Sequence, residues 1–317
     1  MFHCGIIRYI HLLYLESVAL IDKHAGENLV GDIIEEFWYI SAVLYSKINP
    51  FMIRHFGMDK VGFFLRRIKR ARTIEVEGSL FGFDPEVSTS FGHMLGGSFN
   101  EPETHKLLKS VINNLDGIDL FVDVGSNIGE FVIDIASFDK VGRVIGFEPN
   151  LPCVKSCLKS IELNGLKKAE IRQKLLKDSK EPVTFDISGE NANAHSIFTP
   201  PPNKSDVIYS STIDDEFGDV NVSSILLIDV EGAEALVLAG ARSFIERNIP
   251  FIIFEYNFVS TRYFSLEDVR KLLPTGYDIF RLRVKDGFLD RNMEDMWNCV
   301  AVHKDSPFYP VAMRLVR

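Results

Sequence analysis

The chain has 317 residues, of which 46% are apolar and 25% are charged. These values exclude a disordered, collagen-like or repeat protein and are ordinary for a globular chain. The formal net charge of −9 excludes a general electrostatic attraction to nucleic acid, so we expect no nucleic-acid partner. Residues 119–317 carry 30 acidic and 23 basic side chains, so most of the excess negative charge lies in this part of the chain.

The first 72 residues are rich in aliphatic and aromatic side chains without strand-like alternation, which predicts a helical N-terminal extension. Charged residues or proline interrupt its two most apolar stretches, 6–21 and 37–53. Neither stretch reaches the roughly 18 uncharged residues that a membrane-spanning helix needs. The start of the chain also lacks a cationic head and a small-residue cleavage site. We therefore expect no membrane span, with weak peripheral membrane contact as a minor alternative.

Five basic side chains fall within residues 66–72, at the end of this extension. The simplest interpretation is a solvated helix end, where cations also suit the helix dipole. The alternative is a contact with an anionic substrate group or a membrane surface. Four cysteines give no disulfide framework, and Cys153 and Cys157 are spaced too widely for a C-x-x-C pair. We interpret them as reduced thiols of a cytoplasmic protein.

Residues 73–91 alternate and turn at Gly78, which predicts a β-hairpin or two short strands. Pro102 then stands in the first turn of a helix that we expect to begin at Asn100 or Glu101 and to reach about Leu115. We treat residues 73–118 as the lead-in to the larger unit at 119–317. Together they form one predicted domain, 73–317, that follows the extension.

From Leu120 onward, short apolar strands alternate with helical patterns. This alternation predicts right-handed βαβ units and an α/β fold, a mostly parallel sheet with helices on both faces. The predicted strands are 120–124, 143–147, 169–176, 183–187, 225–230, 251–255, 277–284 and 298–303, and the predicted helices are 128–138, 151–164, 232–247 and 266–273. No clear helix separates the last two strands, so one of them is expected to run antiparallel at the edge. Residues 189–219 are predicted to form a long polar connection, either a functional loop or a mobile one.

The first predicted strand leads into the turn Asp123-Val-Gly-Ser-Asn-Ile-Gly129. Glycine lets the backbone approach a ligand closely, and the helix that follows offers free amides. Glu148 ends the next strand, where an acid can accept both hydroxyls of an adenosine ribose. The pyrophosphate fingerprint G-x-G-x-x-G is absent, and Asp123 would repel a pyrophosphate but suits an ammonium group. The pattern thus favours S-adenosylmethionine, with a purely structural turn as the alternative.

A second acidic cluster follows the uninterrupted strand that ends near Ile228. If extension persists, Asp229 and Glu231 leave that strand on the same face. Glu234 is expected to share a helix face with Glu231, and both also suit a helix N-terminus. Ligands of an open parallel sheet bind beyond the carboxyl ends of its strands. We therefore expect a row of acids at this edge: Asp123, Glu148, Asp229 and Glu255.

Three segments together resemble the FkbM family of S-adenosylmethionine-dependent methyltransferases. They are the turn at 123–129, Gly-Phe-Glu-Pro-Asn at 146–150 and, above all, Ile-Asp-Val-Glu-Gly-Ala-Glu at 228–234. The resemblance covers about 73–304, leaves 1–72 uncovered and departs at Ser126, where Ala is more usual. It implies a Rossmann-like class I methyltransferase fold and O-methylation of a hydroxyl on a sugar, a glycan or a polyketide-type small molecule.

The expected roles follow from this chemistry. A positioned base should remove the proton of an alcohol, and Asp229 is the first candidate, with Glu231 and Glu255 as partners and His195 as a further base or lid contact. The residues expected to bind S-adenosylmethionine are Asp123, Gly125, Ser126, Asn127, Gly129, Glu148 and Pro149. No metal ligand is assigned, although the acids clustered with Asn257 would also suit Mg²⁺.

Three other functions remain as alternatives. An NAD-dependent oxidoreductase is disfavoured by the missing third glycine and by Asp123. A non-catalytic binding module that keeps the nucleotide fold is disfavoured by the intact acids. A nitrogen or protein methyltransferase is disfavoured because the chain has no Asn/Asp-Pro-Pro-Tyr/Phe tetrapeptide.

Overall fold

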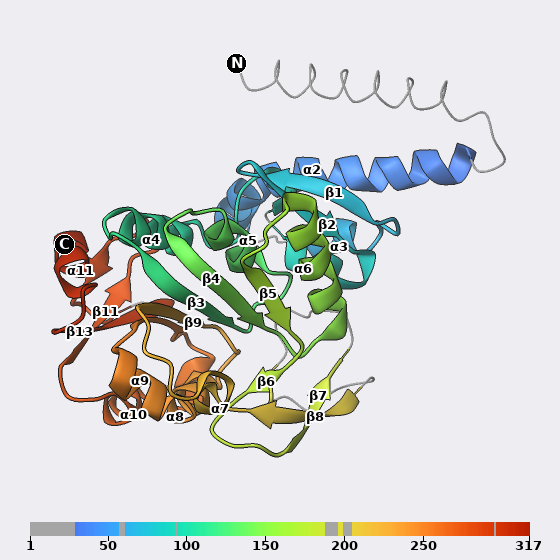
Figure 1. Ribbon diagram of the computed structural model, residues 1–317. Coiled ribbons are helices and arrows are strands. Elements are labelled where there is room, and N and C mark those ends of the chain that lie inside the picture. Colours follow the sequence, from blue (N-terminus) through green and yellow to red (C-terminus); the bar gives the residue numbers. More distant parts are fainter. Residues whose placement is uncertain (1–28, 57–60, 93, 188–195, 199–204, 295) are drawn as a thin grey trace.

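An eight-stranded sheet forms the centre of the computed structural model, which describes residues 29–56, 61–92, 94–187, 196–198, 205–294 and 296–317 (Figure 1). In spatial order its strands are β12 (Leu289–Asp290), β11 (Tyr277–Leu282), β13 (Asn298–His303), β10 (Phe251–Glu255), β9 (Ser224–Ile228), β3 (Ile118–Val124), β4 (Val141–Phe147) and β5 (Ala169–Arg172). The run from β10 to β5 is parallel throughout. This architecture is the predicted Rossmann-like class I methyltransferase fold.

Helices cover both faces of this sheet, so its central strands are apolar on both sides. Every residue of β9 and β10 is buried. One apolar core lies under α4 (Pro102–Asn113), α5 (Glu130–Ala136), α6 (Leu151–Asn164) and α11 (Tyr309–Leu315). A second core lies under α7 (Ile213–Phe217), α8 (Glu234–Ala239), α9 (Arg242–Asn248) and α10 (Leu266–Leu272), on the opposite face (Figure 1).

The sequence predicted that one of the last two long strands would run antiparallel at the edge of the sheet. The antiparallel one is β13, and it lies inside the sheet. β13 lies between β10 and β11 and runs antiparallel to both. The return of the chain into this gap needs no crossover helix, which explains why none separates the last two long strands in the sequence.

Two further predictions were wrong. The expected single helix at 232–247 is two helices, because Gly240 lies against another segment. A β-carbon at Gly240 would be 2.0 Å from the carbonyl oxygen of Lys177, and the Gly240 carbonyl accepts the amide of Asp214. The expected long connection at 189–219 contains β8 (Ser205–Ser211) and α7. β8 pairs with β6 (Leu175–Leu176) and β7 (Pro182–Asp186) in a separate small sheet.

The predicted hairpin, β1 (Arg72–Val76) with β2 (Ser79–Phe83), is fixed to α6 by side-chain hydrogen bonds to its backbone. Asn164 bonds both the amide and the carbonyl of Leu80, and Ser160 accepts the amide of Gly82. The short 3₁₀ helices η1 (Pro85–Phe91) and η2 (Met94–Gly96) follow. Phe81 and its neighbours form a third core with residues of the N-terminal extension.

The described part of that extension consists of α2 (Leu29–Phe56) and α3 (Val61–Leu65), as expected for a helical segment. The basic cluster after α3 is partly neutralised by α2. Arg70 and Arg72 pair with Asp32 and Glu36, and the Arg67 guanidinium stacks 3.5 Å from the ring centre of Phe63. Within the described ranges, no helix has both the length and the apolarity needed to cross a membrane.

Candidate active site

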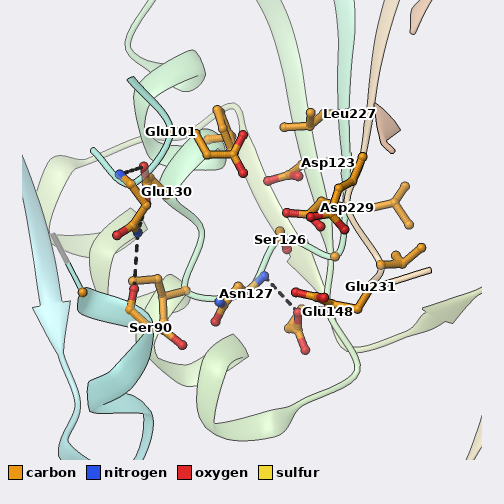
Figure 2. Close-up of a pocket in the computed structure, with 18 of the residues that line it drawn as sticks. Ser90, Glu101, Asp123, Ser126, Asn127, Glu130, Glu148, Leu227, Asp229 and Glu231 are labelled. Carbon is orange, nitrogen blue, oxygen red and sulfur yellow. Dashed lines mark hydrogen bonds between the residues drawn. The ribbon is translucent and has the colours of Figure 1, made fainter. Parts of the chain in front are cut away.

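A cavity of about 1370 Å³ opens at the carboxyl ends of β3, β4, β9 and β10. The acids predicted for this edge all line it, as does Glu231: Asp123, Glu148, Asp229, Glu231 and Glu255. Figure 2 shows the side chains of Asp123, Asp229 and Glu148 in this pocket, beside the turn that carries Ser126 and Asn127. The wall facing the sheet is completed by residues of the lead-in and the extension, including Glu101 and Arg66.

The glycine turn after β3 is shaped by left-handed backbone at Gly125, Asn127 and Gly129, with φ of 88°, 49° and 82°. Space is also restricted at both glycines. A β-carbon at Gly125 would lie 1.7 Å from the carbonyl oxygen of Asp229, and one at Gly129 would lie 2.2 Å from the sulfur of Cys157. Glycine is therefore required here for packing as well as for conformation.

Glu148 ties the loop after β4 to this turn. Its carboxylate accepts the backbone amides of Asn127 at 2.9 Å and Asn150 at 2.7 Å. Burial raises the pKa of Glu148 to about 7, and the two amides oppose that shift because they favour the charged form. Pro149 follows it and also lines the cavity.

Asp123 is the most deeply buried of these acids, with only 2% of its surface exposed. Burial raises its pKa well above the usual value, and the charges of Glu148 and Glu101 add to the rise. Within the part of the chain that the structure describes, Asp123 Oδ2 and Ser126 Oγ have no hydrogen-bond partner. Buried polar atoms without partners are costly in a native protein, so both are available to a ligand.

Asp229, Glu231 and Glu255 form a second group, in which one carboxylate oxygen of each lies within 4.8 Å of the others. The extended backbone predicted between Asp229 and Glu231 is not found, because Glu231 adopts a left-handed conformation with φ of 55°. Glu231 nevertheless reaches the group through this turn. Non-glycine residues in this region are strained and are concentrated at functional sites.

Glu234 has a different role from the one expected. Glu234 is the first residue of α8 and is fully buried. Glu231 precedes α8, so the two glutamates do not share a helix face. The Oε1 atom of Glu234 accepts the amides of Val230 at 3.0 Å and Gly232 at 3.1 Å. Glu234 therefore holds the turn that presents Glu231.

Burial and the charges of nearby acids raise the pKa of every member of this group. For Asp229 the largest cause after burial is the charge of Glu255, and for Glu255 it is the charge of Glu231. The pKa of Glu231 is raised by burial and then by Glu234. The site therefore favours a bound proton or an added positive charge.

Asn257 orients Glu255 and does not offer its own oxygen to the group. Its amide nitrogen donates to Glu255 Oε1 at 2.6 Å. Its oxygen accepts the amides of Val259 at 2.7 Å and Ser260 at 3.2 Å. His195, the further candidate base, lies outside the described residues.

The sequence analysis missed two features of the opposite wall. Glu101 occupies the N-cap position of α4, and its side chain accepts hydrogen bonds from Thr104 Oγ1 at 2.9 Å and Asn298 Nδ2 at 2.8 Å. The sequence showed Glu101 only as a helix start, and the contact with Asn298 joins residues 197 positions apart.

The second missed feature is a buried ionic network centred on His105. Its ring nitrogens contact Asp134 at 2.5 Å and Glu130 at 3.0 Å, and its ring stacks between Phe99 and Phe131. Glu130 also accepts the backbone amide of Asn100 at 2.7 Å, so the network stiffens one wall of the cavity. A histidine inside a helical pattern gave no signal of this arrangement.

Comparison with known proteins gives a family match. Residues 123–280 match the family model described as Methyltransferase FkbM domain. No curated protein matches the chain significantly.

Solved structures also resemble the chain, at low identity. Methyltransferase FkbM from Methylobacillus flagellatus is 19% identical, with a TM-score of 0.42, over 59% of this chain and 44% of that one. An rRNA methylase from Streptococcus thermophilus is 10% identical, with a TM-score of 0.38, over 63% and 96%. TYW2 from M. jannaschii in complex with AdoMet is 12% identical, with a TM-score of 0.40, over 74% and 84%. The chain thus spans less than half the length of the first of these proteins.

Proposed function

This chain belongs to the FkbM family of methyltransferases, and on that premise we propose that it uses S-adenosylmethionine to methylate a hydroxyl group. The acceptor we propose is a sugar, a glycan or a polyketide-type small molecule. One observation carries the proposal: a single cavity joins the glycine turn and Glu148 to the acids Asp229, Glu231 and Glu255. Its volume of about 1370 Å³ exceeds the roughly 300–1000 Å³ of ordinary small-molecule pockets, which suits a cofactor and an acceptor together.

The residues on the β3–β4 side fit the cofactor. Glu148 would accept the ribose hydroxyls, and the turn from Gly125 to Gly129 would let the ligand approach the backbone. The unpartnered oxygen of buried Asp123 suits the ammonium group of the methionyl part, because a buried carboxylate is stabilised by a cation. Pro149 completes this wall. When bound, S-adenosylmethionine supplies a methyl group activated by its positively charged sulfur.

The residues on the β9–β10 side fit a hydroxyl acceptor. Asp229 would accept the hydroxyl hydrogen bond and take up the proton as the oxygen is methylated. Glu231 and Glu255 would hold Asp229 and the neighbouring hydroxyls in position, and much of the rate comes from such alignment. His195, which lies outside the described residues, remains a proposed base or lid contact. A cytoplasmic location is also part of the proposal, and Cys153, Cys157 and Cys299 support it as buried free thiols.

Calorimetric titration with S-adenosylmethionine tests the cofactor assignment. Wild-type protein should bind it. Glu148→Gln should bind it at least about tenfold more weakly, because a hydrogen bond to a charged group is lost. Glu103→Gln is the matched control, because Glu103 lines the cavity without a proposed contact. NAD is titrated in parallel, and binding of NAD alone would refute the assignment.

Mass spectrometry tests the reaction. Incubation with candidate sugars, glycans and polyketide-type alcohols should yield a product heavier by one methylene group. Asp229→Asn should keep cofactor affinity and lose most of the turnover. Full turnover in Asp229→Asn would remove Asp229 from the role of base.

A further inference from the structure

The acids at the ends of β9 and β10 have the spacing of a cation site. One oxygen from each of Asp229, Glu231 and Glu255 lies within 4.8 Å of the other two. Oxygen ligands lie about 2.0–2.6 Å from Mg²⁺ or Ca²⁺, so oxygens on opposite sides of one ion are about 4–5 Å apart. The three carboxylates could therefore contact one ion without moving their backbones apart.

A second observation also points to a ligand at this position. Glu255 is only 7% exposed, and its Oε2 atom is buried without a hydrogen-bond partner among the described residues. Asn257 holds the other oxygen, Oε1, at 2.6 Å, which fixes the carboxylate with Oε2 left open. Asp229 Oδ1 is likewise buried and without a partner within the same ranges.

No basic side chain neutralises this group in the described part of the chain. The ion pairs found there include none with Asp229, Glu231 or Glu255, although acids elsewhere, such as Glu216 with Arg172 and Lys174, are paired. Buried carboxylates are normally paired or bound to metal, because an isolated buried charge is costly. The strained turn at Glu231, held by Glu234, keeps a third charge in the group in spite of this cost.

We propose that Asp229, Glu231 and Glu255 bind one hard divalent cation, Mg²⁺ or Mn²⁺. Both ions prefer oxygen ligands in octahedral sites. Mg²⁺ takes about six oxygens, so three monodentate carboxylates leave positions open toward the cavity. A cation there would bind oxygens of the acceptor, and its charge would make a bound hydroxyl easier to ionise.

This consequence for the acceptor rests on the proposed function, whereas cation binding itself does not. A monodentate Asp229 keeps its second oxygen, which remains able to take the hydroxyl proton. The site then favours acceptors that present two neighbouring oxygens, such as a vicinal diol of a sugar.

The test is Mn²⁺ titration of the full chain, followed by electron paramagnetic resonance without any methyl donor. Wild-type protein should bind about one Mn²⁺, with Mg²⁺ competing. Asp229→Asn, Glu231→Gln and Glu255→Gln should each weaken binding at least about tenfold. Glu103→Gln, a cavity acid outside the group, should bind like wild type.

Two further measurements keep the outcome clear. Mn²⁺ should raise the melting temperature of the wild type and not that of the triple variant, which also shows whether the variant folds. Glu148→Gln should lose cofactor affinity and keep Mn²⁺ binding, which separates this inference from the cofactor assignment. Absence of bound Mn²⁺ in folded wild-type protein at millimolar concentration, or equal binding in the folded triple variant, overturns the proposal.

Discussion

Gly125 packs directly against the backbone carbonyl of Asp229: a β-carbon on Gly125 would lie 1.7 Å from that oxygen. The amide of Asp229 also donates to the carbonyl of Val124 at 2.9 Å. The turn assigned to the cofactor and the acids assigned to the acceptor are therefore adjacent segments of backbone, and neither can shift without moving the other.

Gly125→Ala should accordingly impair both sides of the cavity. The left-handed conformation alone costs a non-glycine residue about 1–3 kcal/mol, and the clash with Asp229 adds to it. Gly165→Ala is the matched control, because Gly165 is also left-handed, with φ of 64°, but a β-carbon there meets nothing within 4 Å. Urea denaturation should show the larger loss for Gly125→Ala. Equal losses would mean that the turn relaxes away from Asp229.

Cofactor affinity should depend on pH through Glu148. Its pKa is raised to about 7, and in the proposed complex only the ionised form would accept both ribose hydroxyls. Cofactor affinity should therefore rise by up to about tenfold per pH unit below about pH 7 and level off above it. Without ligand, the folded state holds this proton more tightly than the unfolded state, so Glu148 lowers stability as pH rises from 4.5 to about 7. Calorimetric titration with S-adenosylmethionine across this pH range should show this rise in affinity, and the slope of affinity against pH should be smaller in Glu148→Gln.

Replacement of His105 should destabilise the wall formed by α4 and α5. His105→Gln removes a buried partner of Glu130 and Asp134, which costs about 3–5 kcal/mol for a buried ion pair. The two carboxylates raise the pKa of His105 against the opposing effect of burial. Its contribution is therefore complete below the unfolded pKa of about 6.5 and is lost as pH rises through the higher folded value.

Denaturation of wild type and His105→Gln at several pH values checks this prediction, and the difference between them should shrink at alkaline pH. His303→Gln is the control, since the His303 ring bonds backbone groups of Thr275 and Asp305. A difference that does not change with pH would mean that His105 acts by packing alone.

Asp229→Asn should stabilise the cation-free protein while it removes activity. The substitution keeps the shape of the side chain and removes one of several buried like charges, which we expect to add about 0.5–2 kcal/mol to the free energy of unfolding. Asp214→Asn is the contrast, because both Asp214 oxygens accept backbone amides, from Ser243 and Phe244. That variant should be less stable than wild type. Thermal unfolding in the presence of a chelator measures both.

Local patterns predicted the parts of the fold that local chemistry decides. Helix α6 ends at Asn164 with left-handed Gly165, and β10 spans Phe251–Glu255 as its apolar run indicates. The break at Gly240 was not predictable, because its cause is the carbonyl of Lys177 in a distant segment. Strand β8 was missed because it is polar and exposed along much of its length and belongs to a separate small sheet, where it lies between β6 and β7.

The candidate site likewise has features that the sequence predicts and features that it does not. The acids at strand ends were predictable because parallel strands end at one edge of a sheet. The turn at Glu231 was not, because it depends on hydrogen bonds from its backbone neighbours to Glu234. Glu101 and the His105 network were missed because their partners lie on other elements and become neighbours only in the folded protein.

The position of β13 has a consequence for the order in which the protein can mature. Asn298 pairs with Glu255 in the sheet and donates its side-chain amide to Glu101. One residue near the C-terminus thus braces both the acid at the end of β10 and the opposite wall. During synthesis the cavity would remain incomplete until this strand leaves the ribosome and inserts between β10 and β11. A nascent chain that stops before Asn298 should therefore be inactive, even though the glycine turn after β3 has already been synthesised.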